Sequence, residues 1–444
     1  MSVKVRFAPS PTGRLHVGNV RTALANWLFA RNQGGAFVLR IDDTDLERST
    51  KAFEDGIDTD LRWLGLTWDE RYNQSARAGL YRDVAEKLKA SGRLYACYET
   101  QEELDRRRKV QLSRGQPPIY DRAALQLTDE DRRRLESEGR RAHWRFRLDG
   151  RRVRWNDLAR GPSEVDTASM SDPVLIREDG AFLYTLPSVI DDVDMAITHV
   201  IRGEDHVTNT GAQIEIFQAL GAVEPGFSHM PLLVGADGEA LSKRLGSLSI
   251  SELREQGVEP LAVVSHLARI GTSDALQAGA SLEELGAGFS FDKMGRAPAR
   301  YDTADLDRLN AQVLHAMDYA EAKVRLEAIG ADLGAAFWAA ISQNLETFDQ
   351  ARSWADVVRG PISPSPERAP LLETAASLLP PEIDEGTWAK WADAVREATG
   401  AKGRALFMPL RQAITGHDHG PDMASLLPLI GRERIFGRLR GERV

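Results

Sequence analysis

The sequence has one cysteine and no long apolar run, and each absence excludes a class of protein. A single cysteine, Cys97, cannot form a disulfide within the chain or supply a zinc site built from several thiolates. We predict that Cys97 is a half-buried packing residue. No apolar run approaches the roughly 18 residues that cross a bilayer. The first ten residues, MSVKVRFAPS, lack the charged and then apolar pattern of a signal peptide, which predicts a cytoplasmic location away from membranes.

The chain also lacks an overall positive charge, because its 57 Lys and Arg face 66 Asp and Glu, a formal net charge of −9. The total argues against a polyanionic partner, but the charge is unevenly distributed. Residues 131–160 hold eleven arginines against five acidic residues, with Trp144 and Trp155 among them. Basic and aromatic side chains interleaved in this way suit a nucleic-acid backbone and its bases. A solvated arginine-rich surface would explain the charge equally well, so both interpretations stay open on charge alone.

The first fifty residues predict a β-α-β unit. A strand over 3–8 leads into a loop of Pro, Ser and Gly, a helix begins at 16–19 and stops at 34–35, and a second strand covers 37–41. The buried face of this helix is marked by apolar residues at helical spacing: Val20, Ala23, Leu24, Trp27 and Leu28. Free backbone N–H groups and the helix dipole make such a helix start a binding site for anions. The stretch therefore predicts a phosphate-binding turn.

The rest of the chain predicts a sheet domain with an insertion, followed by a helical half. Strand-like segments return at 195–201 and 230–234, after an irregular stretch over 93–185 that we interpret as an insertion between two halves of one sheet. After residue 310 the periodic segments are all helical: 311–329, 333–348, 387–398, 404–415 and 423–440. The predicted class is α/β, a Rossmann-like doubly wound parallel sheet with an inserted domain, followed by an all-helical half.

Two segments far apart in the chain could act together on a nucleotide. His16 lies at the helix start, where it could donate to a phosphate oxygen as negative charge develops. Lys243 lies in the Gly- and Asp-rich segment around residues 241–244 (LSKR), from which a flexible cation could reach triphosphate oxygens. Each signal is weak alone, because a lone His beside a glycine is usually structural. Together they predict an enzyme that activates a substrate with a nucleotide.

Several longer motifs are similar to those of bacterial glutamyl-tRNA synthetases, which are class I aminoacyl-tRNA synthetases. They are residues 8–18 (APSPTGRLHVG), 40–45 (RIDDTD), 64–70 (LGLTWDE), 197–206 (ITHVIRGEDH), 241–244 (LSKR) and 409–416 (PLRQAITG). They occur in the family's order and cover nearly the whole chain, so coincidence is a poor explanation.

The resemblance implies an ATP-dependent ligase that attaches L-glutamate to tRNA(Glu). The family forms a glutamyl-adenylate, passes the glutamyl group to the terminal adenosine of the tRNA, and releases AMP and diphosphate. ATP with Mg²⁺ is implied, and zinc is not expected because the cysteine cluster of zinc-binding members is missing; we assign no metal ligands. The resemblance makes His16 and Lys243 the HIGH-type and KMSKS-type catalytic groups. It adds further ATP-binding positions: Thr12, Gly18, Asn19, Glu204, Leu233, Ser242 and Arg244.

The resemblance also implies a glutamate pocket. Arg6 and Arg202 fall where the family places the arginines that bind the side-chain carboxylate, and glutaminyl enzymes lack the second arginine. Either arginine could instead pair with a structural carboxylate such as Asp42 or Asp192. Asp42 would meet the substrate ammonium and Ser10 its backbone groups. The remaining implied pocket residues are Ala8, Tyr184, Ser188 and His206.

Two departures from the family pattern bear on activity. Asp42 stands where the family usually has the longer Glu, so we expect its contact with the ammonium to go through a water or to require a shifted substrate. Ala240 stands where the family has the first lysine of its KMSKS-type loop, which leaves Lys243 as the main charge there.

The implied domain order divides the chain into five segments. They are the first half of the catalytic domain at 1–92, an inserted domain for the tRNA acceptor end at 93–185, the second catalytic half at 186–249, a helical stem-contact domain at 250–309, and an anticodon-binding domain at 310–444.

Three alternatives remain. A catalytically silent paralogue that binds tRNA is supported only by Ala240, and a small-molecule nucleotidyltransferase is disfavoured by the helical half. A non-discriminating enzyme that also charges tRNA(Gln) is slightly favoured, because residues 342–348 (SQNLETF) lack the arginine that strict members tend to carry there. We expect a monomer in each case.

Overall fold

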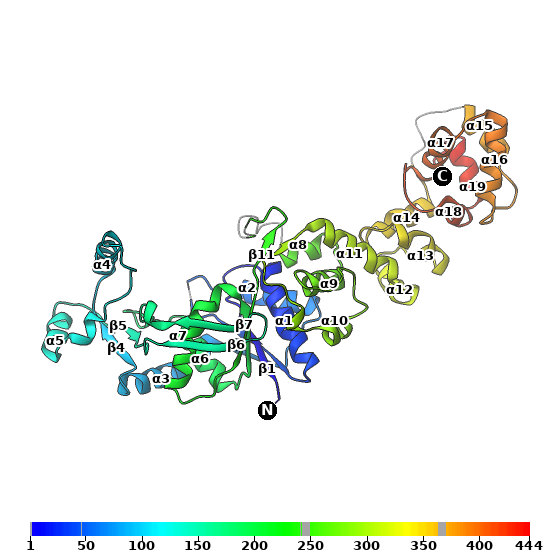
Figure 1. Ribbon diagram of the computed structural model, residues 1–444. Helices are drawn as coiled ribbons and strands as arrows, with labels where there is room; N and C mark the ends of the chain where they lie inside the picture. Colours follow the sequence, from blue (N-terminus) through cyan, green and yellow to red (C-terminus); the bar gives the residue numbers. More distant parts are fainter. Residues whose placement is uncertain (1, 46, 240, 242–248, 363–369) are drawn as a thin grey trace. The chain divides into compact units, whose positions relative to one another are not determined.

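The computed structural model describes residues 2–45, 47–239, 241, 249–362 and 370–444. They form two compact units, Met1–Leu253 with Val264–Asp302 and Arg254–Val263 with Thr303–Val444 (Figure 1). The first unit contains the sheets, and the second is built from helices. The finer division into five segments stays a prediction.

A seven-stranded sheet organises the first unit, in the order β3-β2-β1-β9-β10-β6-β7. The strands are β1 (Lys4–Phe7), β2 (Ala36–Ile41), β3 (Glu70–Asn73), β6 (Arg152–Asp157), β7 (Gly161–Asp166), β9 (His199–Gly203) and β10 (Gly226–Met230). All neighbours pair in parallel except β6 and β7, which are antiparallel. The strand order reverses between β1 and β9, so the predicted doubly wound sheet is confirmed.

Helices connect the parallel strands, as parallel pairing requires. They are α1 (Val17–Asn32), α2 (Lys51–Trp63), α3 (Ala78–Ala90), α6 (Thr185–Asp194) and α7 (Val207–Ala219) (Figure 1). The five apolar positions predicted for the buried face of α1 are all at most 6% exposed. The chain leaves α1 through Gly34, whose φ of +59° lies in the left-handed region that glycine adopts at little cost. The predicted β-α-β turn is therefore confirmed.

The predicted insertion contains a second, antiparallel sheet. Its strands are β4 (Leu94–Cys97), β5 (His143–Phe146) and β8 (Val174–Ile176), and its helices are α4 (Gln101–Ser113) and α5 (Asp129–Ser137). Neither α4 nor α5 has a buried residue. Strands β6 and β7 also fall within residues 93–185, yet they extend the main sheet. The insertion thus contributes to the domain that it interrupts.

The remaining strands of the first unit correct two predictions. Met195 follows the end of α6, so the strand predicted from 195 begins only at His199. The strand predicted over 230–234 is divided: β10 ends at Met230, and β11 (Leu233–Gly235) pairs in parallel with β12 (Ala299–Tyr301). Three helices complete the sequence up to residue 302: α8 (Ile250–Glu255), α9 (Pro260–Arg269) and α10 (Leu282–Gly288). Short 3-10 turns cover Gln74–Arg77, Ala123–Gln126, Thr167–Ser169, Glu204–His206, Phe291–Lys293 and Ser342–Asn344.

The second unit is helical in its described residues after 303, as predicted. Its helices are α11 (Thr303–Ala316), α12 (Tyr319–Ala328), α13 (Ala335–Ile341), α14 (Gln350–Arg359), α15 (Pro370–Ser377), α16 (Thr387–Thr399), α17 (Arg404–Thr415), α18 (Met423–Ile430) and α19 (Arg432–Leu439). Two predicted long helices are broken by local chemistry: Asp318 caps α12, and Gly431, with φ +84°, separates α18 from α19. The core includes Phe337, Trp338, Trp354 and Trp391. In the described part of the chain, no helix is both long and apolar enough to cross a membrane.

Candidate active site

A cavity of about 820 Å³ opens at the carboxyl ends of β1 and β9, where the strand order reverses. Ligands of open α/β sheets bind at this position because the connections diverge there and leave a crevice. Most of the predicted site residues line it: Arg6, Ala8, Ser10, Thr12, His16, Gly18, Asn19, Asp42, Tyr184, Arg202, His206 and Leu233. The fold therefore brings together residues that are up to about 230 positions apart in sequence.

His16 caps the start of α1, and its hydrogen bonds determine its tautomer. Its Nδ1 accepts from the backbone N–H of Gly18 at 3.1 Å, so the proton of the neutral ring is on Nε2. Burial lowers the pKa of His16 below its ordinary value, which favours this neutral form. The Nε2–H is thus a fixed donor on the cavity wall beside the positive end of the α1 dipole.

Gly18 and Asn19 hold His16 in place. Asn19 Oδ1 accepts from the backbone N–H of His16 at 3.4 Å, the reciprocal half of a capping box. A Cβ at position 18 would lie 3.0 Å from His16 Cε1, so any side chain there would push the imidazole aside. The glycine that sequence analysis associated with the phosphate loop also makes room for the ring.

The pocket wall formed by β1 and β2 is a dense cluster of paired charges. Arg6 Nε lies 3.0 Å from Asp192 Oδ1, and Arg40 Nη1 lies 2.8 Å from the same oxygen. Arg40 Nε also donates to Asp42 Oδ1 at 2.8 Å. Of the two alternatives left open for the arginines, Arg6 does pair with a structural carboxylate, Asp192, although it still lines the cavity.

Asp42 lines the cavity but has a protein partner. Both of its carboxylate oxygens accept from Arg40, at 2.8 and 3.3 Å. Burial raises the pKa of Asp42 to about 6, although Arg40 and Arg6 act in the opposite direction. A substrate ammonium would have to share this carboxylate with Arg40.

Arg202 is held quite differently. Its guanidinium is buried, and among the described residues no carboxylate oxygen lies within 4.0 Å of it. Its hydrogen bonds go to neutral acceptors: Thr210 Oγ1 at 2.8 Å, His229 Nε2 at 3.2 Å, the carbonyl of His206 at 3.4 Å and the hydroxyl of Tyr184 at 3.5 Å. Burial lowers the pKa of Arg202 and the charge of Arg6 lowers it further, while Tyr184 and the more distant carboxylate of Asp192 act in the opposite direction. The arrangement suits a ligand that brings its own carboxylate.

Two predicted site residues in the described part of the chain do not line the cavity. Ser188 is buried, and its Oγ accepts from Arg40 Nη2 at 3.3 Å, so it supports the paired cluster. Glu204 pairs with Arg160 at 2.6 Å and accepts from the backbone N–H of Leu232 at 3.2 Å. Sequence similarity identified both positions without revealing these protein partners.

Sequence analysis missed Arg21, a buried arginine of α1 that lines the cavity. It donates to the carbonyls of Pro231 at 2.6 Å and Ile270 at 3.2 Å, and burial lowers its pKa to about 10. The signal was present, because a charged residue next to Val20 breaks the apolar face of α1. Asp205 also lines the cavity and was missed.

The predicted phosphate-binding lysine lies outside the described residues, as do Ala240, Ser242 and Arg244. The described residues on either side are informative. Leu241 lines the cavity, and Ser249 forms an antiparallel bridge with His16. In the sequence, Lys243 therefore lies two positions after Leu241, which lines the cavity, and six before Ser249, which pairs with His16.

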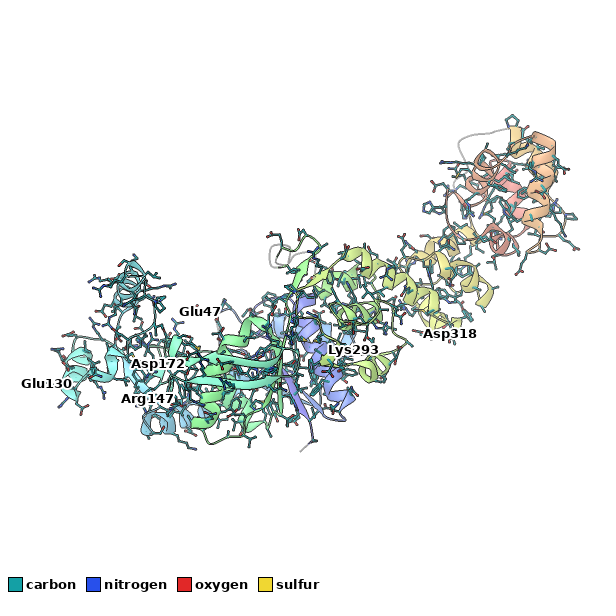
Figure 2. All side chains as sticks on the ribbon, viewed as in Figure 1. Glu47, Glu130, Arg147, Asp172, Lys293 and Asp318 are labelled. Atoms are coloured by element: carbon teal, nitrogen blue, oxygen red, sulfur yellow. The ribbon has the colours of Figure 1, made fainter. Side chains whose placement is uncertain are left out.

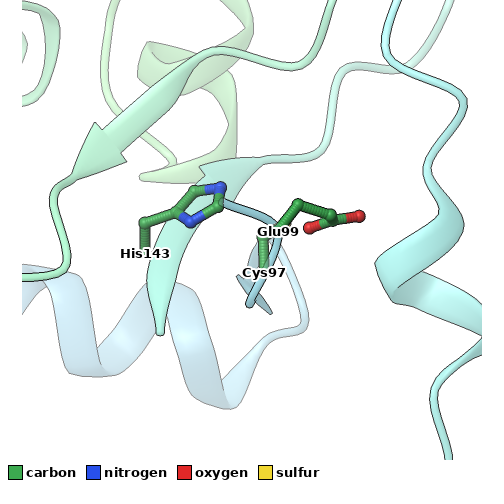
Figure 3. Close-up of side chains that lie close together, drawn as sticks. All are labelled: Cys97, Glu99 and His143. Atoms are coloured by element: carbon green, nitrogen blue, oxygen red, sulfur yellow. The ribbon is translucent and has the colours of Figure 1, made fainter. Parts of the chain in front are cut away.

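Cys97, Glu99 and His143 lie close together where β4 ends and β5 begins (Figure 3), and none of them lines the cavity. Their ligand-type atoms lie within 4.8 Å of one another. Cys97 is fully buried rather than half-buried, and burial raises the pKa of its thiol to about 12, whereas a metal ligand must be a thiolate. The hydroxyl of Tyr120 donates to Glu99 at 2.7 Å. The same hydroxyl also lies 3.7 Å from Cys97 Sγ, whereas Glu99 Oε2 and His143 Nε2 are buried without a hydrogen-bond partner in the described part of the chain. The expectation of no zinc stays a prediction.

Family comparisons cover both units. Residues 2–308 match the model for tRNA synthetases class I (E and Q), catalytic domain, and residues 364–442 match the model for an anticodon binding domain. The first match includes every residue of the cavity.

Individual relatives match along their whole lengths. Glutamate–tRNA ligase 1 of Maricaulis maris is 58% identical over 441 residues, 99% of each chain, and glutamate–tRNA ligase 1 of Parvibaculum lavamentivorans is 59% identical over 440 residues, 98% of each. A crystal structure of a glutamate tRNA ligase from Elizabethkingia meningosepticum, in complex with its amino acid, superposes with a TM-score of 0.85 at 28% identity and covers 99% of both chains.

Proposed function

The chain belongs to the glutamate–tRNA ligases among the class I aminoacyl-tRNA synthetases and charges tRNA(Glu) with glutamate at the expense of ATP; from this premise we propose how its residues divide the work. The cavity between β1 and β9 would hold ATP on the α1 side and glutamate on the Arg202 side. The observation that carries this assignment is Arg202, a buried guanidinium on the cavity with neutral protein partners.

The ATP side is the start of α1. The Nε2–H of His16 and the positive end of the α1 dipole would meet phosphate oxygens, with Thr12, Gly18, Asn19 and Leu233 nearby on the cavity wall. Lys243, with Ser242 and Arg244, would add positive charge from the segment between Leu241 and Ser249. Charge that develops on the phosphate would then be met from two directions.

The glutamate side is built around Arg202 and Arg6. Arg202 would supply the main charge for the side-chain carboxylate, because its own contacts leave that charge uncompensated. Arg6, which shares Asp192 with Arg40, would assist. Asp42 would meet the ammonium, and Ala8, Ser10, Tyr184 and His206 would complete the pocket. Ser188 would act through Arg40 only.

The chemistry proceeds in two displacements. The α-carboxylate of glutamate attacks the α-phosphorus of ATP, forming a carboxyl–phosphorus anhydride as the bond to diphosphate breaks. A hydroxyl of the terminal adenosine of the tRNA then attacks the activated carbonyl carbon and loses its proton, and AMP leaves with the bonding electron pair. The protein mainly positions the reactants and neutralises charge, as in other reactions at phosphorus.

Magnesium would enter with the phosphates of ATP and neutralise part of their charge. Such ions keep several waters and use one or two protein carboxylates at most. Asp205 is an exposed carboxylate on the cavity wall that could serve in this way. Glu204 is less suited, because it is paired with Arg160.

The second unit would select the tRNA, since it contains the residues that match an anticodon binding domain. The lack of arginine in residues 342–348 favours the alternative of a non-discriminating enzyme that also charges tRNA(Gln). Comparing the charging of purified tRNA(Glu) and tRNA(Gln) decides this, and refusal of tRNA(Gln) removes the relaxed alternative. A monomeric state and a cytoplasmic location stay predictions.

The assignment is tested by ATP-dependent attachment of labelled glutamate to tRNA(Glu). We expect Lys243→Ala to lower kcat by about a hundredfold, the usual cost of losing one group that stabilises transition-state charge. Lys51→Ala is the matched control, because Lys51 pairs with Asp55 at 3.0 Å, does not line the cavity and lies outside the segments predicted to contact tRNA. Equal activity of the two variants would show that the phosphate-binding segment is assigned wrongly.

A further inference from the structure

Behind Arg202 lies a buried histidine–aspartate pair that does not line the cavity and that sequence analysis did not single out. We propose that His229 and Asp157 are positioning residues for Arg202: they fix the direction of its guanidinium through a neutral acceptor and leave its charge for the side-chain carboxylate of the substrate. The inference rests on the proposed role of Arg202 and adds the two residues that orient its guanidinium for that role.

The three side chains form a continuous chain of hydrogen bonds. Arg202 Nε donates to His229 Nε2 at 3.2 Å, and His229 Nδ1 lies 2.5 Å from Asp157 Oδ2. The side chains of His229 and Asp157 are fully buried, so bulk water cannot replace either contact. The chain thus runs from the cavity wall into the sheet.

The direction of each proton follows from donor and acceptor chemistry. The Nε–H of an arginine can only donate, so His229 Nε2 must be the unprotonated nitrogen. The ring proton is then on Nδ1, where it donates to the Asp157 carboxylate. Asp157 is itself held, because its Oδ1 accepts from the backbone N–H groups of Ala159, Arg160 and His229, each at 3.1 Å. Asp157 therefore selects the only tautomer of His229 that can accept from Arg202.

A neutral hydrogen-bond partner can orient Arg202 without compensating its charge, whereas a carboxylate partner would do both. Arg6 is anchored by Asp192 at 3.0 Å, which fixes its position but also compensates its charge. If Arg202 had the same anchor, the substrate carboxylate would enter a site whose cation already had an anion. With an imidazole and the Thr210 hydroxyl as partners, Arg202 is oriented and still uncompensated.

The sheet explains how three distant residues meet. His229 on β10 is the direct register partner of Arg202 on β9, so their side chains share one face of the sheet. Asp157 ends β6, the next strand, which pairs with β10. It lies 72 positions before His229 and within the predicted insertion. The pairing of β6 with β10 in the main sheet is what brings Asp157 within hydrogen-bond distance of His229.

Electrostatics keep the ring neutral. Burial lowers the pKa of His229, and the nearby charges of Arg202 and Arg160 lower it further, while the hydrogen bond to Asp157 acts in the opposite direction. A protonated ring would place an N–H against the N–H of Arg202, so geometry and charge favour the same state.

The isosteric variant Asp157→Asn tests the inference. An asparagine oxygen can still accept from the three backbone N–H groups, but its amide N–H₂ would face both His229 Nδ1 and the Nε1–H of Trp155, which donates to Asp157 Oδ2 at 3.2 Å. The ring proton would move to His229 Nε2, towards the Thr210 hydroxyl at 3.0 Å and against the donor of Arg202. We expect KM for glutamate to rise about tenfold, the usual cost of mispairing one hydrogen bond to a charged group. The KM values for ATP and tRNA(Glu) should change little, and the preference for glutamate over glutamine should fall.

Three further variants separate positioning from folding. His229→Gln places an amide oxygen near the position of Nε2 and should keep KM for glutamate closer to wild type than His229→Ala. Asp172→Asn is the matched control, because Asp172 is an equally buried carboxylate whose partners are Tyr95, Arg122 and Leu148, away from the cavity (Figure 2). It should leave KM for glutamate unchanged.

The outcomes distinguish this inference from the assignment beneath it. If Arg202→Gln leaves KM for glutamate unchanged, the assigned pocket is wrong. A second outcome is that Arg202→Gln raises KM for glutamate, whereas Asp157→Asn, like Asp172→Asn, leaves it unchanged. The assigned pocket would then be supported, and the positioning role of His229 and Asp157 would be overturned. A parallel rise of all three KM values in both His229 variants, with a lower Tm, would also overturn it in favour of a structural role.

Discussion

The two walls of the cavity use arginine in opposite ways. On the β1–β2 wall, Arg6 and Arg40 share Asp192, and Arg40 also holds Asp42. On the β9–β10 wall, Arg202 is anchored by an imidazole and a hydroxyl. Both walls contain buried arginines, so residue type and burial do not distinguish them. The charge of the hydrogen-bond partners determines whether each arginine is already compensated.

The difference separates stability from binding. A buried cation with anionic partners is part of the folded structure, because removing it leaves carboxylates without compensation. A buried cation with neutral partners costs free energy to bury and recovers that cost only when an anion arrives. The first wall is thus a scaffold, and the second wall is a receptor for a negatively charged ligand.

The largest expected effect comes from breaking the paired wall. Arg40→Leu should lower the free energy of unfolding by about 3–5 kcal/mol, because Asp42 and Asp192 lose their shared cation in a buried site. Chemical denaturation measures the loss. Arg154→Leu removes an arginine from the exposed pair with Glu164 and should change stability little. Comparable losses in the two variants would contradict the distinction.

Breaking the receptor wall should affect binding instead. Arg202→Gln is expected to lower kcat/KM for glutamate by about a hundredfold, the usual order for truncating one partner of a buried charge pair. Its Tm should stay the same or rise, because an uncompensated buried charge is removed. Charging kinetics and thermal unfolding on one preparation give both quantities. A large drop in Tm would mean that Arg202 is structural, like Arg40.

The pH dependence of glutamate binding sharpens the role of Asp42. Its pKa is raised to about 6, so the ionised form that attracts an ammonium predominates above pH 6 and is lost as the pH falls below it. KM for glutamate should therefore rise below pH 6, by about tenfold at pH 5. Asp42→Asn should show a high KM without this inflection. If the variant keeps the inflection, another group is responsible.

The smallest effect concerns Tyr184. Its hydroxyl lies 3.5 Å from Arg202 Nη1, at the limit of a hydrogen bond, whereas Thr210 accepts at 2.8 Å. Tyr184→Phe should raise KM for glutamate by less than about threefold, because so long a contact contributes little. A loss as large as that of Arg202→Gln would mean that the hydroxyl itself binds the substrate.

Much of the site could be predicted from sequence, because its elements are local. The β-α-β turn depends on the apolar face of α1, the stop at Gly34 and the position of His16, all within fifty residues. The capping role of His16 and the need for Gly18 beside its ring were not predicted, since both depend on side-chain geometry at the helix start.

Helix boundaries in the second unit show the limit of periodicity. The apolar pattern continued through Asp318 and Gly431, yet the structure begins α12 after the first and separates α18 from α19 at the second. A cap or a left-handed glycine can end a helix while the hydrophobic spacing stays in phase.

The sequence by itself determined the α/β-then-helical order of the fold through residue types and spacing, and the resemblance of its motifs to a known family gave the class of the protein and twelve of the residues on the cavity wall. Only the tertiary structure decided which charges are already paired. Asp192 meets Arg6 across 186 positions, and Asp157 meets His229 across 72. Such contacts arise from strand order in the sheet, which no local pattern encodes, and they determine which arginine is left to bind glutamate.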